Sequence, residues 1–304
     1  MERSFLGTHF PKHIRDRYCE MIVDCHMHTP LCGHATGSPL DYLKVGNQKG
    51  IHLMTFTCHV PMRQPSFGGQ RIRMDRNQLE DYFQLVEEAR KQGKACGTEV
   101  LCGIEAEVFP VAEELEEMKA LLQAHPFDFV LGSLHHQLKA YHDWLEDRKV
   151  VSDEDIIRDY FKHLADAAQS GLYHSMSHPD VIRIYGTIDP ESFIPQRFET
   201  EIRGFLKACA TSGTCMEVNT SGLSKGVYEL HPDPLILDWA FEEGVDLTIG
   251  SDAHAPENVG RHFERVLPLL YSKGFRSLHY FKGGKKHSTA MSASIESASA
   301  LECL

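Results

Sequence analysis

Short apolar runs alternate with longer amphipathic segments over most of the chain. The runs have the length of buried strands, and seven of them stand out: Met21–Cys25, His52–Thr57, Val100–Ile104, Phe127–Leu131, Leu172–Met176, Thr214–Val218 and Val245–Ile249. The segments between them repeat apolar residues at helical spacing, and they include Asn77–Lys94, Val111–Ala124, Asp153–Gln169, Gln196–Ala210 and Asp233–Glu243. This alternation predicts an α/β protein with a parallel sheet, which over roughly 250 residues closes most readily into a barrel. An open, doubly wound sheet is the alternative.

Residues that can bind metal ions follow the predicted strands. His26 and His28 have the i, i+2 spacing that puts both imidazoles on one face of a strand, and His34 follows in a loop that can fold back over the same strand end. The later strands lead to His59, Glu105, His135, His178, Asp252 and His254. The C-terminal ends of the strands collect the chemistry of such a barrel. These seven histidines, one glutamate and one aspartate therefore predict a buried cluster of divalent metals.

Composition and charge exclude several other classes of protein. The chain has 304 residues, 42% of them hydrophobic, which is enough for one large core. Its net charge is −12, so a phosphate backbone would be repelled over most of the surface and we expect no nucleic-acid partner. The nine cysteines form no C-x-x-C pair, and neither a signal peptide nor a long apolar span stands out. We therefore expect a cytoplasmic protein with no membrane association.

The metal-binding candidates lie in strings that resemble the PHP (polymerase and histidinol phosphatase) superfamily. In chain order these are DCHMHT, LCGHA, the His59 position, GIEAEV, GSLHH, SHPD and GSDAH, and they span roughly Met21 to Leu270. Two later features, EVNTSGL with the Pro232-Asp233-Pro234 segment and Asn258-Val259-Gly260-Arg261, are similar to the stand-alone histidinol-phosphate phosphatase branch. The resemblance implies a distorted seven-stranded (β/α)7 TIM-like barrel, the PHP fold, that holds three metal ions.

The same resemblance implies how the ligands are shared among the ions. The first ion would bind His26, His28, Glu105 and Asp252. Glu105 would bridge to a second ion on His135 and His178, and the third ion would bind His34, His59 and His254. Imidazole and carboxylate ligands suit zinc, manganese or iron, so two to three divalent ions of these kinds are expected. His136, Asp24 and Glu107 are expected to pack beside the ligands or support them.

Such a cluster favours hydrolysis of phosphate esters. Neighbouring divalent ions bring the pKa of a bridging water towards neutrality, and the resulting hydroxide can attack phosphorus in line with the leaving oxygen. Arg261 and Arg183 are candidate contacts to the phosphate, and Asp252 or His254 could relay a proton to the departing alkoxide. With the resemblance, this predicts a phosphoric monoester hydrolase that converts a small phosphorylated metabolite, L-histidinol phosphate, to L-histidinol and phosphate.

Three alternatives stay open. The same scaffold could act on another small phosphate ester or diester, such as a nucleotide or a sugar phosphate. An amidohydrolase would also begin with His-x-His in a barrel, but it typically has a bridging lysine where this chain has Glu105. A non-enzymatic metal-binding module is the third alternative, and the complete ligand set disfavours it.

The remaining segments are expected to shape the pocket or to flank the domain. The connection Pro61–Asp75, with Arg71 and Arg73, resembles an active-site lid. A loop over Lys139–Val151 is a second candidate wall, where Asp143 could meet an amine of the substrate. We expect residues 1–20 to be an N-terminal extension and residues 282–304 a Ser/Ala-rich tail, which leaves residues 21–281 as one catalytic domain.

Overall fold

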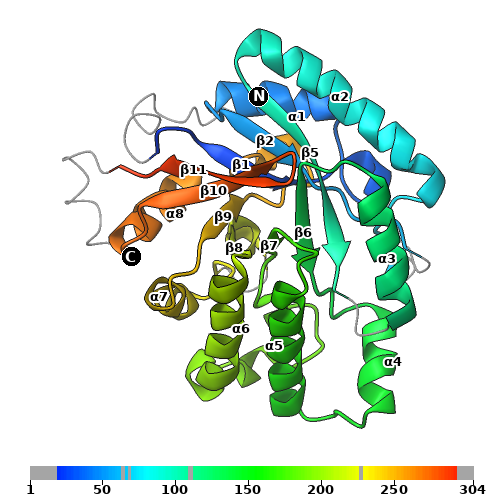
Figure 1. The fold of residues 1–304 in the computed structure, drawn as a ribbon, viewed down its shortest axis with the longest axis vertical. Helices are drawn as coiled ribbons and strands as arrows, with labels where there is room; N and C mark the ends of the chain where they lie inside the picture. Colours follow the sequence, from blue (N-terminus) through cyan, green and yellow to red (C-terminus); the bar gives the residue numbers. More distant parts are fainter. Residues whose placement is uncertain (1–18, 63–65, 68–69, 109–111, 226–228, 293–304) are drawn as a thin grey trace, which may run out of the picture.

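The fold is built on seven parallel strands. The computed structural model describes residues 19–62, 66–67, 70–108, 112–225 and 229–292. Its main sheet has the strand order β1-β2-β5-β6-β7-β8-β9 (Figure 1). The strands are β1 Val23–Met27, β2 Leu53–Phe56, β5 Glu99–Glu107, β6 Phe129–Ser133, β7 Ser175–Met176, β8 Cys215–Asn219 and β9 Leu247–Gly250. All seven predicted strands are confirmed, each within a few residues of its expected bounds.

The first and last strands of the sheet meet, so the sheet nearly closes into a barrel. Met27 of β1 forms a parallel bridge with Ala253, which follows β9, and His28 N donates to Ala253 O at 2.9 Å. β7 contributes only two residues to the sheet, so the wall of the barrel is irregular there. The expected distorted, seven-stranded TIM-like barrel is confirmed, and the meeting of the edge strands disfavours the open sheet.

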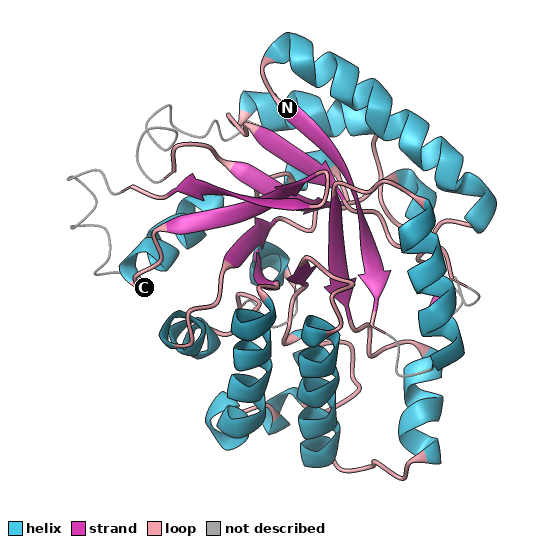
Figure 2. Ribbon diagram, in the orientation of Figure 1, coloured by secondary structure: helices cyan, strands magenta, loops and turns pink. Residues whose placement is uncertain are grey.

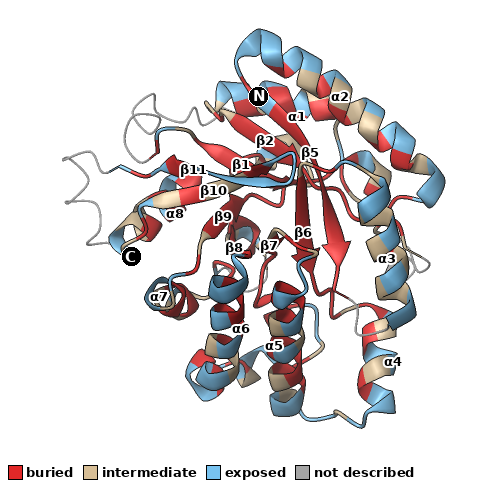
Figure 3. Cartoon of the chain, viewed as in Figure 1, coloured by how far each residue is buried: buried red, intermediate tan, exposed pale blue. Residues whose placement is uncertain are grey.

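Helices surround the sheet, with their buried residues facing inwards and their exposed residues facing outwards (Figures 2 and 3). They are α1 Pro39–Gln48, α2 Leu79–Cys96, α3 Ala112–Ala124, α4 Lys139–Asp147, α5 Asp153–Gln169, α6 Glu199–Ser212, α7 Pro234–Glu242 and α8 Phe263–Ser272. The five predicted helices correspond to α2, α3, α5, α6 and α7. The prediction of a loop over Lys139–Val151 was wrong, because α4 occupies most of this segment. Tyr141 and Leu145, one turn apart on this helix, are buried.

Side-chain caps set the first turn of several helices. At α1, Asp41 N donates to Ser38 Oγ at 3.3 Å and Ser38 N donates to Asp41 Oδ2 at 2.8 Å, which is a capping box. Ser152 caps α5 by accepting a hydrogen bond from the backbone of Asp155. Asp233 caps α7 just before Pro234, the first helical residue. Local sequence therefore fixes where these three helices begin.

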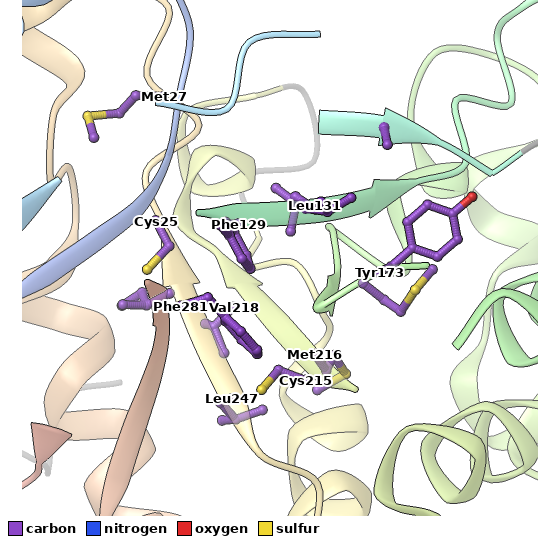
Figure 4. Close-up of a cluster of buried hydrophobic side chains, with 14 of the residues drawn as sticks. Cys25, Met27, Phe129, Leu131, Tyr173, Cys215, Met216, Val218, Leu247 and Phe281 are labelled. Carbon is purple, nitrogen blue, oxygen red and sulfur yellow. The ribbon is translucent and has the colours of Figure 1, made fainter. Parts of the chain in front are cut away.

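The strands are buried on both faces, as a parallel sheet enclosed by helices requires. Every residue of β1, β2, β6, β8 and β9 is buried. Figure 4 shows part of this core, where Cys25, Phe129, Cys215 and Leu247 come from four different strands. The apolar residues of the strands thus form the body of the molecule, which leaves their C-terminal ends for polar side chains.

A C-terminal hairpin packs across the N-terminal ends of the strands. β10 Ser277–Lys282 and β11 Lys285–Ala290 pair antiparallel. The ring of Phe281 stacks on those of Phe129 and His174, with centroids 5.4 and 4.7 Å apart. In the turn of the hairpin, Gly284 N donates to the carbonyl of Asp128, just before β6. The hairpin therefore lies at the end of the barrel opposite to the C-terminal ends of the strands.

Residues 285–290 were expected to belong to a tail, and the structure shows a strand instead. Its burial pattern accounts for the difference, because Thr289 is the only buried residue of β11. A strand with five exposed positions out of six has no apolar pattern to reveal it.

Parts of other predicted segments fall outside the described residues. These are residues 1–18 of the expected N-terminal extension, 293–304 of the expected tail, and 63–65 and 68–69 of the expected lid. Within the lid segment, β3 Ser66–Phe67 and β4 Gln70–Arg71 form a short antiparallel hairpin. No helix in the described part of the chain combines the length and the apolar character needed to span a bilayer.

Candidate metal centre

The nine residues predicted to bind metal lie together at the C-terminal ends of the strands. β1 carries His26, with His28 directly after it, and Glu105 lies in β5. The other ligands follow β2, β6, β7 and β9, except for His34, which follows the short helical turn Pro30–Cys32. Parallel strands end at the same edge of a sheet, which is why residues far apart in the chain converge here.

The ligand atoms form several overlapping groups, and within each group the atoms lie within 4.8 Å of one another. Three of the groups are His26, His28 and Asp252; Glu105, His135 and His178; and His34, His59 and His254, while another joins His28, His59 and Glu105. Glu105 also reaches beyond its own group, because its Oε2 is 3.5 Å from His26 Nε2 and 2.7 Å from His59 Nδ1. The structure thus brings together the same sets that the resemblance implies, with Glu105 between them.

Buried polar atoms in the cluster fit bound cations. The Nε2 atoms of His26 and His28 lie 3.1 Å apart, so they can share a proton or a metal ion. Glu105 Oε2 and His254 Nε2 are buried and make no hydrogen bond, although His59 Nδ1 lies 2.7 Å from Glu105 Oε2 without hydrogen-bond geometry. A buried polar atom without a partner is unfavourable, and both residues belong to the groups that could hold a metal ion. Divalent cations would satisfy them.

The charge state of four ligands suits metal binding. Burial lowers the pKa of His59 and of His254 well below the usual value, and it also lowers the pKa of His34. Burial alone would raise the pKa of Glu105, but neighbouring imidazoles, His59 foremost, outweigh it and hold the pKa well below its usual range. The cluster therefore offers neutral nitrogens and an ionised bridging carboxylate, the forms that coordinate divalent ions.

His26 and His28 behave differently from these imidazoles. Burial alone would lower the pKa of each, but the Glu217 carboxylate at His26 and the Asp252 carboxylate at His28 outweigh burial and raise both pKa values. Metal binding at these two imidazoles must therefore displace protons, so metal affinity should fall as the pH falls.

Glu217 in β8 holds two of the ligands from behind. Its Oε1 lies 2.7 Å from His26 Nδ1, and its Oε2 accepts a hydrogen bond from His178 N at 2.9 Å. A carboxylate on the far nitrogen of a ligating imidazole fixes the orientation of the ring. Sequence reasoning assigned no role to Glu217, although its place near the end of a predicted strand was the signal that could have found it.

Glu107 and Arg73 form a similar support behind His135. His135 Nδ1 lies 2.7 Å from Glu107 Oε2, and Arg73 Nη2 donates to the same oxygen at 2.5 Å. Arg73 is fully buried, so it is neither an exposed lid charge nor part of the cavity lining. Arg71 pairs with Asp75 and likewise does not line the cavity. The two arginines of the expected lid are thus not placed to bind phosphate.

Two ligands have backbone conformations that are costly for residues other than glycine. His178 has a φ of 21° and Asp252 a φ of 49°. Such strain persists only where surrounding contacts fix it, and it is concentrated at functional sites. Here the contacts are the hydrogen bond from His178 N to Glu217 and one from Ser221 Oγ to Asp252 Oδ2 at 3.0 Å.

A cavity of about 420 Å³ lies over the cluster and has two cations in its wall, Lys225 and Arg261. Lys225 Nζ donates to Asp252 Oδ2 at 2.9 Å. Arg261 donates through Nε and Nη2 to the backbone carbonyls of Ser251 and Asp252, both at 2.9 Å. Arg261 therefore lies at the pocket as expected. Lys225 was missed, because a lone lysine in a loop has no sequence pattern that marks it.

Arg183, the other predicted phosphate contact, points away from the cavity, and this corrects the prediction. Its side chain is 5% exposed, and its guanidinium lies 3.0 Å from Asp180 Oδ2 and 2.5 Å from Glu229 Oε2. The helical turn Val181–Arg183 directs the side chain back to Asp180. Arg183 does not line the cavity, and we assign it a structural ion-pair role.

Asp143, considered as a contact for a substrate amine, is also placed elsewhere. It lies on the exposed face of α4, where both of its carboxylate oxygens accept hydrogen bonds from Lys139 Nζ at 2.5 Å. It is not part of the cavity lining.

Cys32, which sequence reasoning did not consider, lies with His28 and His254 at a distance suited to a shared ion.

Comparisons with known proteins find a matching family model and similar relatives. A sequence profile of the PHP domain matches residues 24–221. A "Probable histidinol-phosphatase" of Deinococcus radiodurans is 32% identical over 262 residues, which cover 85% of this chain and 96% of that protein. A protein of the same name from Schizosaccharomyces pombe is 28% identical over 278 residues, covering 87% of this chain and 90% of that protein.

A solved structure has the same fold. Histidinol phosphate phosphatase from Lactococcus lactis, crystallised with zinc, L-histidinol and phosphate, superposes with a TM-score of 0.73 at 21% sequence identity. The match covers 88% of this chain and 98% of that chain. The PHP-domain match spans most of the chain, and the Deinococcus relative is similar over nearly all of its length. The chain therefore belongs to the PHP family.

Proposed function

We propose that this protein is a metal-dependent phosphomonoesterase that hydrolyses L-histidinol phosphate to L-histidinol and phosphate. The observation that carries the proposal is the clustering of nine ligand residues, seven of which line one cavity that also has Lys225 and Arg261 in its wall. The similarity to proteins named histidinol-phosphatase over most of the chain supports the substrate. Two to three ions of zinc, manganese or iron are the proposed cofactors.

The ligand sets of the proposed metal site are those implied by the family resemblance. His26, His28 and Asp252 would hold one ion, His135 and His178 a second, and His34, His59 and His254 a third, with Glu105 bridging the first two. When bound, such ions supply Lewis acidity and bring the pKa of a coordinated water towards neutrality. Glu217 and Glu107 orient the imidazoles of His26 and His135 through their Nδ1 atoms.

The protein's own cations complete the proposed phosphate site. Lys225 is partly buried, and although burial alone would lower its pKa, the Asp252 carboxylate outweighs that effect and raises it, so the ammonium stays charged. Arg261 is fixed by two backbone carbonyls, which leaves its guanidinium little freedom to reorganise. We infer that both side chains neutralise phosphoryl oxygens and that Asp252 or His254 relays a proton to the departing alkoxide.

A cytoplasmic location is part of the same proposal. All eight cysteines in the described part of the chain are unpaired, and seven of them are buried. Free buried thiols are typical of a reducing compartment, and this agrees with the role in histidine biosynthesis that the substrate suggests.

A screen for phosphate release tests the proposed substrate. The purified protein, reconstituted with manganese or zinc, is given histidinol phosphate, a sugar phosphate, a nucleoside monophosphate and a phosphodiester at equal concentrations. We expect histidinol phosphate to give the highest kcat/KM, and a chelator to abolish release. If a different ester gives the highest kcat/KM, histidinol phosphate is rejected as the substrate, but the proposed phosphatase activity still holds. No release from any ester would reject both.

A further inference from the structure

Gln137 lies in the wall of the same cavity and has no role in the metal cluster. We propose that it selects the leaving group of the substrate, with its side-chain oxygen accepting a hydrogen bond from an N–H of that group. Esters of alcohols that carry an amine or an imidazole would then be preferred over esters without N–H donors. The inference rests on the proposed phosphatase function and names a residue that determines its specificity.

The side-chain oxygen of Gln137 lacks a partner. Gln137 sits in the turn between β6 and α4, two residues after His135, and it lines the cavity. Its Oε1 is buried and makes no hydrogen bond within the described part of the protein. Proteins keep few buried carbonyl oxygens without a donor, so an acceptor left open beside a binding cavity indicates a donor supplied by the ligand.

The lysine, the arginine and the carboxylates of the cavity wall are already engaged. Lys225 is bonded to Asp252, and Arg261 to two backbone carbonyls. The carboxylates among the described lining residues are Glu105 and Asp252, and both belong to the metal cluster. No lining carboxylate in the described part of the chain is therefore free to receive a substrate amine. The described lining has two neutral amides, Gln137 and Asn258, and of these Gln137 carries the buried oxygen that has no hydrogen-bond partner.

A strained aromatic residue adds a second, independent observation. Tyr185 also lines the cavity, is 52% exposed, and has a φ of 70°, a conformation that is unfavourable for a residue with a large side chain. Strain of this kind is concentrated at ligand-binding sites. An exposed phenol ring held at a cavity mouth offers a face on which an imidazole or a cationic group can stack.

His136 links Tyr185 to the turn that carries Gln137. Its Nε2 lies 3.2 Å from the carbonyl of Val181, and its Nδ1 lies 2.5 Å from Thr187 Oγ1, so it contacts the segment on both sides of Tyr185. The rings of His136 and Tyr185 are 6.3 Å apart. One buried side chain thus fixes both walls of the proposed leaving-group site. Histidinol carries both an ammonium group and an imidazole, which suits an N–H acceptor beside an aromatic face.

The test compares discrimination between two esters in three proteins. For wild type, Gln137→Leu and Gln137→Glu, kcat/KM is measured with histidinol phosphate and with glycerol phosphate, which has no N–H donor. We expect Gln137→Leu to reduce the ratio of the two kcat/KM values by roughly 5-fold to 100-fold, because a buried N–H of the substrate loses its acceptor. Gln137→Glu keeps an acceptor oxygen at the position and should restore most of the ratio.

Controls separate recognition from folding. Gln84 is exposed on α2, so Gln84→Leu makes the same chemical change away from the cavity and should leave both kcat/KM values unchanged. Metal content is measured for every variant. If Gln137→Leu lowers activity on both esters equally, or if the ratio does not change, Gln137 does not select the leaving group.

A third ester distinguishes failure of this inference from failure of the proposed function. Phosphoethanolamine carries an ammonium group but no imidazole. Wild type could fail to hydrolyse histidinol phosphate but prefer phosphoethanolamine over glycerol phosphate. If Gln137→Leu then removes that preference, histidinol phosphate is rejected as the substrate, and the selection of the leaving group by Gln137 is supported. If wild type prefers neither nitrogen-bearing ester over glycerol phosphate, the inference is overturned.

Discussion

At the scale of single residues, carboxylates link the histidines of the candidate metal centre to one another. Glu105 reaches histidines that follow different strands, and Glu217 holds His26 and His178 together from behind. Removing one carboxylate therefore affects several imidazoles at once. Contacts to phosphate are expected to be more local, because each cation acts through its own side chain.

Substitution of the two arginines proposed from sequence should have different effects, one on catalysis and the other on stability. Arg261→Ala is expected to lower kcat/KM for histidinol phosphate by about tenfold or more, because a fixed cation beside the phosphate is lost. Arg183→Ala should instead destabilise the fold by about 3–5 kcal/mol, because buried Asp180 loses its charged partner. Thermal unfolding and kinetics at a low temperature measure both effects. Unchanged kcat/KM in Arg261→Ala would remove Arg261 from the phosphate site.

The sequence was sufficient to predict which residues meet at the candidate metal centre, but not all of their surroundings. A histidine pair spaced i, i+2 at the end of an apolar run is a strong signal for a metal site, and the family resemblance supplied the remaining ligands. Lys225 and Gln137 lie in irregular segments, where neither spacing nor periodicity predicts the direction of a side chain. Arg183 shows the converse error, since its position after His178 suggested the cavity while a short helical turn directs it to Asp180.

At the scale of secondary structure elements, close packing between strands places the ligands. Gly250 ends β9, where a Cβ atom would lie 2.4 Å from Glu217 Oε1 and 2.4 Å from His26 Cβ. The absence of a side chain at this position thus lets β8 and β1 bring Glu217 and His26 together. Glycine is required here by this close approach, and not by a left-handed backbone conformation.

Replacing Gly250 should therefore damage both stability and metal binding. Gly250→Ala is expected to cost about 1–3 kcal/mol in the free energy of unfolding and to reduce the metal content, because Glu217 or His26 must move. Gly204→Ala on α6 is the matched control, with nothing within 4 Å of the added Cβ. It should be neutral or stabilise by up to about 1 kcal/mol. Full metal content in Gly250→Ala would show that the close approach is not essential.

The elements that were not predicted have weak or short patterns. α4 is nine residues long and follows Leu138, which provides no side-chain cap, so its sequence does not mark a helix start. α1 has a clearer signal in Ser38, Pro39 and Asp41, which are typical of a helix start and could have predicted it. β7 was predicted as five residues and has two, because pairing with both neighbours, not hydrophobicity, limits it.

At the scale of the whole molecule, the two ends of the barrel have different tasks. The C-terminal ends of the strands hold the ligands, while the β10–β11 hairpin covers the N-terminal ends through Phe281. In this kind of barrel, residues at the covered end are expected to contribute stability and not chemistry.

A substitution in the hairpin tests this division. Phe281 is 5% exposed, so Phe281→Ala should destabilise the protein by about 3–5 kcal/mol. At a temperature where the variant stays folded, its metal content and kcat/KM should match those of wild type. Phe241→Ala, at a residue that is 48% exposed on α7, serves as the control and should cost much less. Loss of metal in folded Phe281→Ala would contradict the separation of the two ends.

The metal content of the purified protein tests the central claim most directly. Elemental analysis after extensive dialysis should find about two to three equivalents of zinc, manganese or iron per chain. Glu105→Ala should lose most of this metal together with phosphatase activity, whereas Glu99→Ala, at the exposed start of the same strand, should keep both. Wild-type protein without stoichiometric metal, or Glu105→Ala with full metal and wild-type turnover, would contradict the account.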